Sequence, residues 1–299
     1  MKKDYLDRFY TKDSVAEDCV GSLPKILKVL DYKEVCFLEP SAGGGSFLRA
    51  LKKKYPQNKI ISCDIDKDSV SQYKVDFLFS QKRDLGINKI KEDIVVIGNP
   101  PFGKRSRLAI DFVNKAMEYS DLVAFIVPIQ FGKWSVQSKL RKDLKMIYQK
   151  ELPSNSFILS GKDYQVRTYF QIWTKRSGMK NLRLTGRPPI KHPDFDMFLY
   201  NNTQETLKYF DKSVFKWDFA VPRQGFYNYK ERIEDQRKLK KNIQWMFFRS
   251  IEKIIKKRLL SLDYEKLARK NTTIPGFGKA DVVEEYSSKW GGINQMKLC

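Results

Sequence analysis

Between residues 35 and 127 the chain alternates short apolar runs with helical stretches, and this alternation constrains its fold more than any other feature. Runs rich in β-branched and aromatic residues predict strands over residues 35–38, 59–63, 75–79, 94–97 and 122–127. Apolar residues at helical spacing predict helices over 46–54, 107–117 and 136–147. Strands separated by helices are typical of βαβ units. We therefore expect an α/β fold with a doubly wound, mostly parallel sheet, helices on both faces, and a further strand over 166–173 at the sheet edge.

The pattern changes after Lys175. A Pro-rich segment over residues 186–193 interrupts the chain, and the part that follows is aromatic and basic. Residues 176–299 carry 26 Lys and Arg against 14 Asp and Glu, so they hold the larger share of the net charge of +22. We expect a first domain over residues 1–180 and a smaller basic domain over residues 181–299. A positive charge of this size favours polyanionic partners.

Histidine and cysteine, the residues that most often bind metals or take part in nucleophilic catalysis, are scarce in this chain. The chain has one histidine, His192, which argues against His-rich metal sites and against Ser-His-Asp or Cys-His catalysis. Its cysteines form no C-x-x-C pair and no disulfide-rich spacing, which is typical of a reducing compartment without structural zinc. We expect no metal. The cysteines are Cys19, Cys36, Cys63 and Cys299.

Apolar runs are too short for a membrane helix, which needs roughly 20 apolar residues. The first eight residues lack the apolar core of a signal peptide. We therefore expect a soluble, cytoplasmic, monomeric protein with no membrane association.

A glycine turn follows the first predicted strand, in the segment Glu39-Pro-Ser-Ala-Gly-Gly-Gly-Ser-Phe47. It is neither a phosphate P-loop nor a G-x-G-x-x-G fingerprint, but its glycines allow a ligand to approach the backbone closely. Asp64 ends the second strand 19 residues after Gly45, where an acid binds ribose hydroxyls in doubly wound folds. Asp76-Phe77 ends the next strand, where a carboxylate can accept a hydrogen bond from an adenine amino group. Each acid taken singly could be an ordinary loop residue; together they predict a nucleoside site.

The fourth strand ends in Gly98-Asn-Pro-Pro-Phe-Gly103. Two prolines stop the strand and stiffen the turn, because they lack an N–H and have a fixed φ. The side-chain oxygen of Asn99 and the carbonyl of Pro100 could accept both hydrogens of an exocyclic NH₂, while Phe102 stacks on the ring that carries it. The alternative is a rigid turn with a buried phenylalanine.

These segments resemble the class I S-adenosylmethionine-dependent methyltransferases that methylate amino groups, and among them the DNA N6-adenine methyltransferases. The resemblance covers roughly residues 9–173 and its motif order is that of the gamma group, in which a target-recognition domain follows the catalytic one. Phe9-Tyr-Thr11 is similar to the family's upstream cofactor segment, with Lys12 where proline is usual. The resemblance implies a seven-stranded Rossmann-like sheet and S-adenosyl-L-methionine as cofactor.

The resemblance also implies roles for individual residues. The methionine end of the cofactor would lie among Thr11, Glu39, Ser41, Gly43 and Gly45. The nucleoside end would be held by Asp64 at the ribose, Asp76 at the adenine amine and Phe77 over the ring. The target base would be held by Asn99, Pro100, Pro101 and Phe102.

A stacked duplex base cannot reach such a pocket, so the target must flip out, at a cost of a few kcal/mol. Phe102 would form one face of the base sandwich, and Phe131 or Trp134 the other. For each of these two aromatics, packing under the following helix is an equal alternative.

In the C-terminal part, residues 217–229 mix aromatics with Arg223 and Gln224, side-chain types that pair bidentately with guanine and adenine edges. A base-reading loop is one hypothesis and a packed small-domain core with a surface turn is the other. Residues 236–257 predict an amphipathic helix with a basic face of Lys253, Lys256, Lys257 and Arg258. This face could contact phosphates, or it could be a solvated helix face over a core. No carboxylate-lysine cluster indicates DNA cleavage.

The leading expectation is therefore a DNA adenine-N6 methyltransferase, from a phage, an orphan gene or a restriction–modification pair whose endonuclease acts separately. An RNA adenine-N6 or guanine-N2 methyltransferase is the first alternative. A protein glutamine-N5 methyltransferase is disfavoured by the basic tail. A nucleic-acid-binding module with a dead catalytic domain is disfavoured by the intact Asp64, Asn99 and Phe102.

Overall fold

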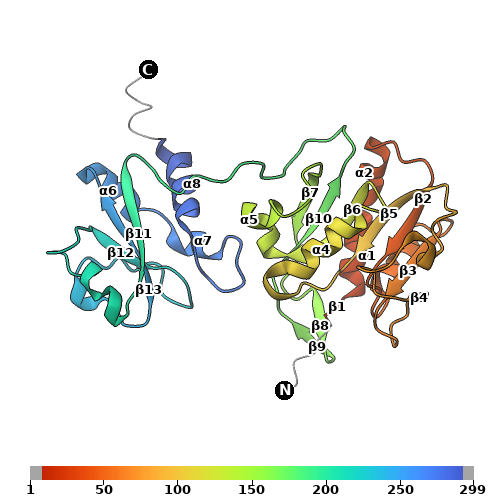
Figure 1. Cartoon of the computed structure of the whole chain (residues 1–299), viewed down its shortest axis with the longest axis horizontal. Coiled ribbons are helices and arrows are strands. Elements are labelled where there is room, and N and C mark those ends of the chain that lie inside the picture. Colours follow the sequence, from red (N-terminus) through yellow and green to blue (C-terminus); the bar gives the residue numbers. More distant parts are fainter. Residues whose placement is uncertain (1–8, 292–299) are drawn as a thin grey trace. The chain divides into compact units, whose positions relative to one another are not determined.

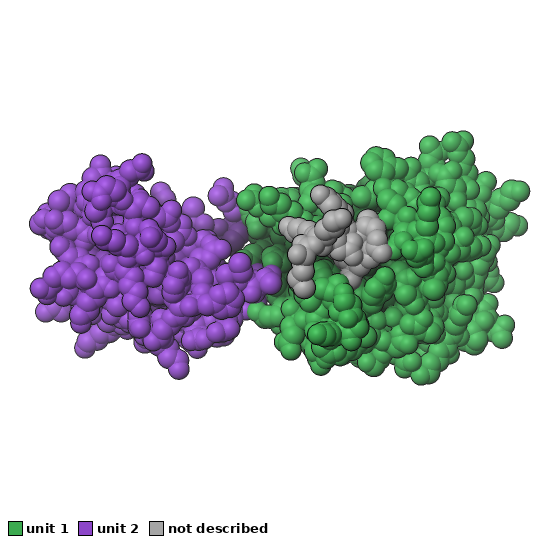
Figure 2. All heavy atoms as spheres, turned by 90° about the horizontal axis from the view of Figure 1, so that it is seen from below, with its two compact units in different colours: residues 1–185 green, residues 186–299 purple. Residues whose placement is uncertain are grey.

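The computed structural model describes residues 9–291, so Cys299 lies outside the described part of the chain. The chain divides into two compact units, residues 1–185 (unit 1) and residues 186–299 (unit 2), coloured separately in Figure 2. Residues 181–185, which the sequence assigns to the second domain, belong to unit 1. Their anchor is Arg183, whose guanidinium donates to the carbonyls of Gln137, Leu140, Arg141 and Leu144 at 2.6–3.0 Å.

Unit 1 is built around a seven-stranded sheet with the order β4-β3-β2-β5-β6-β10-β7 (Figure 1). Its strands are β2 (Val35–Glu39), β3 (Ile60–Asp64), β4 (Tyr73–Lys74), β5 (Asp93–Gly98), β6 (Leu122–Pro128), β7 (Lys145–Glu151) and β10 (Thr168–Thr174). The predicted seven-stranded sheet is confirmed. It is mixed, however: the pairs from β4 to β6 are parallel, whereas β10 is antiparallel to both of its neighbours.

Helices cover both faces of this sheet. On one face α1 (Asp13–Gly21), α2 (Leu23–Val29) and α3 (Ser46–Lys54) pack against alternate strand residues such as Phe37 and Ile97. On the other face α4 (Arg107–Ala116) and α5 (Trp134–Gln137) pack against the intervening residues, such as Leu38 and Val96. A small sheet of β1 (Tyr10–Thr11), β8 (Phe157–Leu159) and β9 (Lys162–Tyr164) completes the unit.

Three predictions about unit 1 were wrong. Residues 75–79 form no strand, because the Asp76 carboxylate accepts from Leu78 N at 2.9 Å and closes a turn just after β4. The helix predicted over 136–147 ends at Gln137, and residues 145–151 form β7 instead. Strand β7 takes the edge position, so β10 lies inside the sheet rather than at its edge, with all its residues buried.

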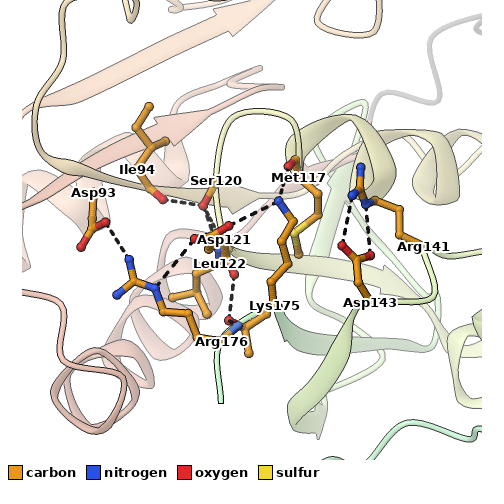
Figure 3. A network of polar contacts seen from close by, with 11 residues as sticks. Asp93, Ile94, Met117, Ser120, Asp121, Leu122, Arg141, Asp143, Lys175 and Arg176 are labelled. Carbon is orange, nitrogen blue, oxygen red and sulfur yellow. Dashed lines mark hydrogen bonds and ion pairs between the residues drawn. The ribbon is translucent and has the colours of Figure 1, made fainter. Parts of the chain in front are cut away.

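A group of ion pairs joins the amino ends of the strands to the segment that leaves β10 (Figure 3). Arg176 pairs with Asp93, at the start of β5, at 2.7 Å and stacks 3.8 Å from the centre of the Tyr32 ring. Lys175 pairs with Asp121, just before β6, at 3.3 Å. These contacts fix the chain where it passes beyond the sheet.

Unit 2 has a three-stranded antiparallel sheet, ordered β11-β13-β12, and three helices. The elements are β11 (Phe195–Asn201), β12 (Phe219–Pro222), β13 (Gln244–Ser250), α6 (Lys253–Leu260), α7 (Tyr264–Arg269) and α8 (Lys279–Trp290). The helix predicted over 236–257 was therefore wrong for most of its length. Trp245 and Phe247 face one side of the sheet and Met246 and Phe248 the other, which is a strand buried on both faces.

Candidate functional site

A cavity of about 210 Å³ opens at the carboxyl ends of β2, β3 and β5. Ligands bind at this edge in open α/β sheets, where the loops after neighbouring strands converge. The lining joins the predicted motif residues with apolar residues from other segments: Phe9, Tyr10, Pro40, Ser41, Gly43, Asp64, Ile65, Asp66, Asp76, Phe77, Leu78, Asn99, Pro100, Pro101, Phe102, Leu108 and Phe112.

The glycine turn and the acid that ends β3 hold each other in place. Gly43 N donates to Asp64 Oδ2 at 2.7 Å, and Asp66 N donates to Asp64 Oδ1 at 2.8 Å. Gly43 has φ 45° and Gly45 has φ 82°, in the left-handed region that favours glycine. Each oxygen of Asp64 keeps a further lone pair, so the carboxylate can still accept from a ligand beside it.

The larger cavity combines carboxylates with apolar walls. Asp64 and Asp76 line it together with Ile65, Phe77 and Leu78. The Phe77 ring is buried and lies 5.4 Å from Phe112 and 5.3 Å from Tyr119, centre to centre. A flat, partly polar ligand would find hydrogen-bond acceptors and apolar surface here at once.

A second, smaller cavity of about 40 Å³ adjoins the first, since Phe9, Tyr10, Ser41, Gly43 and Asn99 line both. It adds Thr11 and Glu39 from the predicted set. The carbonyl of Thr11 accepts from Ser46 Oγ at 2.6 Å, which ties β1 to the start of α3. The predicted methionine-end residues therefore gather around this cavity, except Gly45.

Glu39 is the most buried acid of the site. Burial raises the pKa of its carboxyl well above the ordinary value of 4.5, and the nearby Asp64 raises it further. Its Oε1 accepts no hydrogen bond from the described residues. The carboxyl lies against Gly98, where a Cβ would come within 2.0 Å of Oε1, so only glycine fits at that end of β5.

Asn99 begins the diproline turn after β5 and also has an unfilled acceptor. Its Nδ2 donates to the carbonyl of Phe9 at 3.4 Å, while its Oδ1 is buried and has no partner among the described residues. Buried polar side-chain atoms are nearly always hydrogen-bonded in folded proteins. An acceptor left open in the lining of a cavity therefore indicates a place for a donor from a ligand.

Phe102 is held by other aromatic rings rather than by the turn alone. Its ring centre lies 6.1 Å from Phe9 and 6.3 Å from Phe157, and Phe9 stacks on Tyr164 at 4.6 Å. The small sheet that contains β8 and β9 thus supports this wall of the cavity. Sequence reasoning did not assign roles to the lining residues Phe9 and Tyr10, although the resemblance of the segment that contains them was a signal.

Five candidate residues line neither cavity. Gly45 supports the turn from outside: it precedes α3, and a Cβ there would lie 2.6 Å from Val70 Cγ2. Phe131 is fully buried in the core of unit 1, so its side chain offers no face to a ligand in this structure. Trp134 begins α5 and is half-buried.

Arg223 and Gln224 belong to unit 2, after β12. The Arg223 guanidinium donates to the carbonyl of Phe277 at 2.9 Å, to Gln224 Oε1 at 2.7 Å and to Gln244 Oε1 at 2.9 Å. Its Nε and Nη1 donors thus hold three segments of the unit together.

Within residues 9–291, no group of three His, Cys, Asp or Glu side chains is arranged to hold a metal ion. No helix in that range has the length and apolar character needed to cross a bilayer.

Neither protein-family models nor curated proteins match the chain. Solved structures do match, at low similarity. A protein of Pyrococcus horikoshii, provisionally assigned as an RNA methyltransferase, is 19% identical with a TM-score of 0.38, over 58% of this chain and 91% of its own. The plantazolicin methyltransferase BpumL, crystallised with S-adenosylhomocysteine, is 12% identical with a TM-score of 0.38, over 55% of this chain and 84% of its own.

The N-methyltransferase NodS from Bradyrhizobium japonicum is 9% identical with a TM-score of 0.35, over 54% of this chain and 97% of its own. All three of these proteins are named as methyltransferases. At these scores the similarity carries no argument about activity, which has to come from the site itself.

Proposed function

We propose that this chain transfers a methyl group from S-adenosyl-L-methionine to the exocyclic N6 amino group of adenine in DNA. The observation that carries the proposal is Asn99 Oδ1, a buried acceptor without a donor in the lining of the cavity. An aromatic amine placed there would supply the missing hydrogen bond.

The residues present fit the cofactor. Asp64 can accept from two adjacent ribose hydroxyls, because it lines the cavity and each of its two oxygens keeps a lone pair beyond the one backbone N–H that it accepts. Asp76 can accept from an adenine amine, with Ile65 and Leu78 as apolar walls. Glu39, with its open Oε1, can accept from an ammonium group in the smaller cavity.

When bound, the cofactor supplies a methyl group made electrophilic by a positively charged sulfur. The chain's own residues prepare the nucleophile. The N6 lone pair of adenine is delocalised into the ring, and acceptors on both N6 hydrogens draw the nitrogen toward a tetrahedral geometry with its lone pair directed out of the ring plane. Asn99 Oδ1 and the Pro100 carbonyl are those acceptors, and Phe102 holds the ring.

Positioning accounts for much of the expected rate enhancement, since fixing two reactants in line can lower a barrier by roughly 7–11 kcal/mol. No strong base is needed at the nitrogen, because the N6 proton becomes acidic once the methyl group has been added. The lack of a histidine at the cavity is compatible with this chemistry.

DNA is proposed as the substrate because the chain has a net charge of +22 and favours polyanions. A duplex adenine would have to flip into the cavity, which unstacks it at a cost of a few kcal/mol. Stacking of the flipped base on Phe102 would recover part of that cost.

The test is methyl transfer by the full chain from tritiated cofactor to separate pools of unmethylated DNA, RNA and protein, followed by nucleoside mass analysis. We expect label in DNA as N6-methyldeoxyadenosine, and none with Asn99→Ala. Label confined to RNA or to protein glutamine would replace the proposed substrate. No label in any pool would overturn the proposed activity.

A further inference from the structure

The sheet of unit 2 has two faces that are covered in different ways. On one face α6, α7 and α8 pack on residues such as Met246 and Phe248, and we call this the helix face. On the other face, residues 202–217 and 236–242 cover Trp245 and Phe247, and we call these two segments the loop face. Each segment contains a 3₁₀ turn, Gln204–Tyr209 and Gln236–Lys238.

Hydrogen bonds fix the two segments of the loop face to each other. Lys212 N donates to Gln236 Oε1 at 2.8 Å. Asn202 Nδ2 donates to the carbonyls of Leu239 at 3.1 Å and Lys240 at 2.9 Å, and Asn242 N donates to the Asn202 carbonyl at 3.1 Å. The loop face is therefore one ordered surface rather than two independent loops.

Charge is distributed unevenly between the two faces. The loop face has seven Lys and Arg against two Asp and Glu in 23 residues, and its segment 236–242 has no acid at all. The helix face, taken as residues 252–290, has nine Lys and Arg against six Asp and Glu in 39 residues. The loop face thus has a net charge of +5 in 23 residues, whereas the helix face has a net charge of +3 in 39 residues.

Many of the helix-face cations are already neutralised. Lys256 pairs with Glu234 at 2.9 Å and Lys270 pairs with Glu284 at 3.0 Å. Further pairs join Lys266 and Lys289 to Glu285, and Arg269 to Glu265. Of the four cations that the sequence assigned to phosphate binding, these pairs include Lys256 but not Lys253, Lys257 or Arg258.

The loop-face lysines are not neutralised in this way. Five exposed lysines form no ion pair with any carboxylate of residues 9–291: Lys208, Lys216, Lys238, Lys240 and Lys241. Lys208 lies 5.2 Å from the centre of the Tyr209 ring and Lys212 lies 4.1 Å from that of Trp217, while Arg237 pairs with Asp235 at 2.8 Å. Exposed like charges without counter-charges repel each other and favour a polyanion at the surface.

We propose that the loop face is the surface through which unit 2 binds the phosphate backbone of a nucleic acid. The proposal rests on the proposed function for the class of substrate, and it moves the phosphate-binding surface from α6 to two segments that the sequence did not single out. Lysine is suited to this role because its ammonium is a compact charge that binds phosphates without reading bases.

The test compares two variants of the full chain in which the same number of charges is removed. The first is Lys216→Gln, Lys238→Gln, Lys240→Gln on the loop face. The matched control is Lys266→Gln, Lys270→Gln, Lys289→Gln on the helix face. Binding of a fluorescent DNA duplex is measured by anisotropy over a range of salt concentrations, without cofactor, and circular dichroism checks that each variant is folded.

Affinity for a duplex decreases with salt, and the steepness of log affinity against log salt decreases by about 0.9 for each phosphate that the protein no longer neutralises. We expect the slope of the loop-face variant to be smaller by about 2–3, and its binding to be roughly tenfold or more weaker at about 0.1 M salt. The control should keep a slope within about one of the wild type. Equal slopes in the two triple variants, or a wild type that does not bind DNA, would overturn the proposal.

The readout separates this inference from the proposed function. A loop-face variant with a reduced slope supports the surface even if the wild type methylates no DNA. Methylation of DNA by a loop-face variant whose salt slope equals that of the wild type supports the activity and refutes the surface. Weaker binding to an RNA duplex alone, with DNA binding unchanged, would also refute it as a DNA-binding face.

Discussion

Within residues 9–291, each unit buries one carboxylate almost completely, and the surroundings of the two carboxylates differ. Glu39 in unit 1 and Asp194 in unit 2 are both 1% exposed. Asp194 Oδ2 accepts a hydrogen bond from the Tyr286 hydroxyl at 2.9 Å, and the ring of His192 packs 4.8 Å from that of Tyr286. Glu39 Oε1 has no donor among the described residues.

A buried acceptor without a donor costs about 1–3 kcal/mol. At the adjoining cavities of unit 1, three buried oxygens have no partner among the described residues: Glu39 Oε1, Ser41 Oγ and Asn99 Oδ1. Unit 2 also has a buried oxygen without a donor, Asn202 Oδ1, which lines neither cavity, but its buried acid Asp194 has a donor. Asp194 therefore serves the packing of its unit. The pocket of unit 1 instead has buried acceptors without donors, and a ligand that supplies the donors would remove their energetic cost.

The largest effect that could break this contrast is expected for Asn99→Ala. Removing one preorganised hydrogen-bonding group from a transition state typically lowers the rate by about 10²–10³-fold. We expect single-turnover methyl transfer to fall by at least that much, with S-adenosylhomocysteine affinity in calorimetry nearly unchanged.

The control for this variant is Asn58→Ala, since Asn58 Nδ2 donates to the Val35 carbonyl at 2.9 Å, away from the cavities. It should keep its methyl-transfer rate. A normal rate in Asn99→Ala, or an equal loss of cofactor binding and transfer, would mean that the open acceptor does not mark the target site.

Gly98→Ala should have the next largest effect, on stability. A Cβ at this position would meet Glu39 Oε1 at 2.0 Å, so the buried carboxyl must move, and overpacking of this kind costs about 1–3 kcal/mol. Urea denaturation of the full chain measures the decrease. Gly21→Ala is the matched control, because nothing lies within 4 Å of a Cβ there.

A double variant makes this test specific. Glu39→Ala removes the carboxyl that the new methyl group would meet, so Glu39→Ala with Gly98→Ala should be less destabilised than the sum of the single changes. Strict additivity would show that the two residues are not in contact.

Asp64→Asn tests the nucleoside end. The substitution keeps the shape but removes the charge and one acceptor, and hydrogen bonds to a charged group contribute about 1.5–3 kcal/mol. We expect S-adenosylhomocysteine affinity to fall roughly tenfold or more in calorimetry. The exposed Asp68→Asn should bind normally. Unchanged affinity in Asp64→Asn would remove this residue from the ligand and leave it only its bonds to Gly43 N and Asp66 N.

The smallest effect is expected for Glu39→Gln, and it is a change in the free energy of unfolding. Unlike most substitutions in a core, it should stabilise the chain. Because burial raises the pKa of Glu39, the folded chain holds a proton that the unfolded chain releases above about pH 4.5, so the contribution of Glu39 to stability falls as pH rises. Glu39→Gln should therefore raise the free energy of unfolding by about 1 kcal/mol near pH 7, and the gain should vanish toward pH 4.

Asp194→Asn is the control for Glu39→Gln. The Tyr286 hydroxyl already donates to this acid, so no gain in the free energy of unfolding is expected. Urea denaturation of both variants at several pH values provides the measurement. A gain in Asp194→Asn that equals the gain in Glu39→Gln would end the distinction between the two buried acids.

Most of the pocket could be predicted because its residues follow strands that the sequence marks clearly. Apolar runs rich in β-branched and aromatic residues placed β2, β3 and β5, and parallel strands bring their carboxyl ends together. Asp64, Asp76 and Asn99 thus share one cavity although they are distant in sequence. Phe131 could not be placed in the same way, since its position just after β6 does not decide whether its side chain turns toward the core.

The rest of the fold depends on long-range pairing that local patterns do not contain. Residues 145–151 form a strand only because β10, some 25 residues later, pairs with them. In the same way β13 takes up residues that could be read as helical, because β11 and β12 pair with it on either side and apolar residues cover its two faces. Unit 2 also has no motif that would have separated the loop face from the helix face.

The antiparallel direction of β10 has a consequence for how such a chain can diversify. Thr174 pairs with Leu122 at the start of β6, so β10 ends at the edge of the sheet opposite the cavities. The chain that follows the Arg176 ion pairs thus leaves the sheet of unit 1 at the edge opposite the cavities. A C-terminal module could therefore be inserted, exchanged or lost in evolution without a change in the loops that line the cavities.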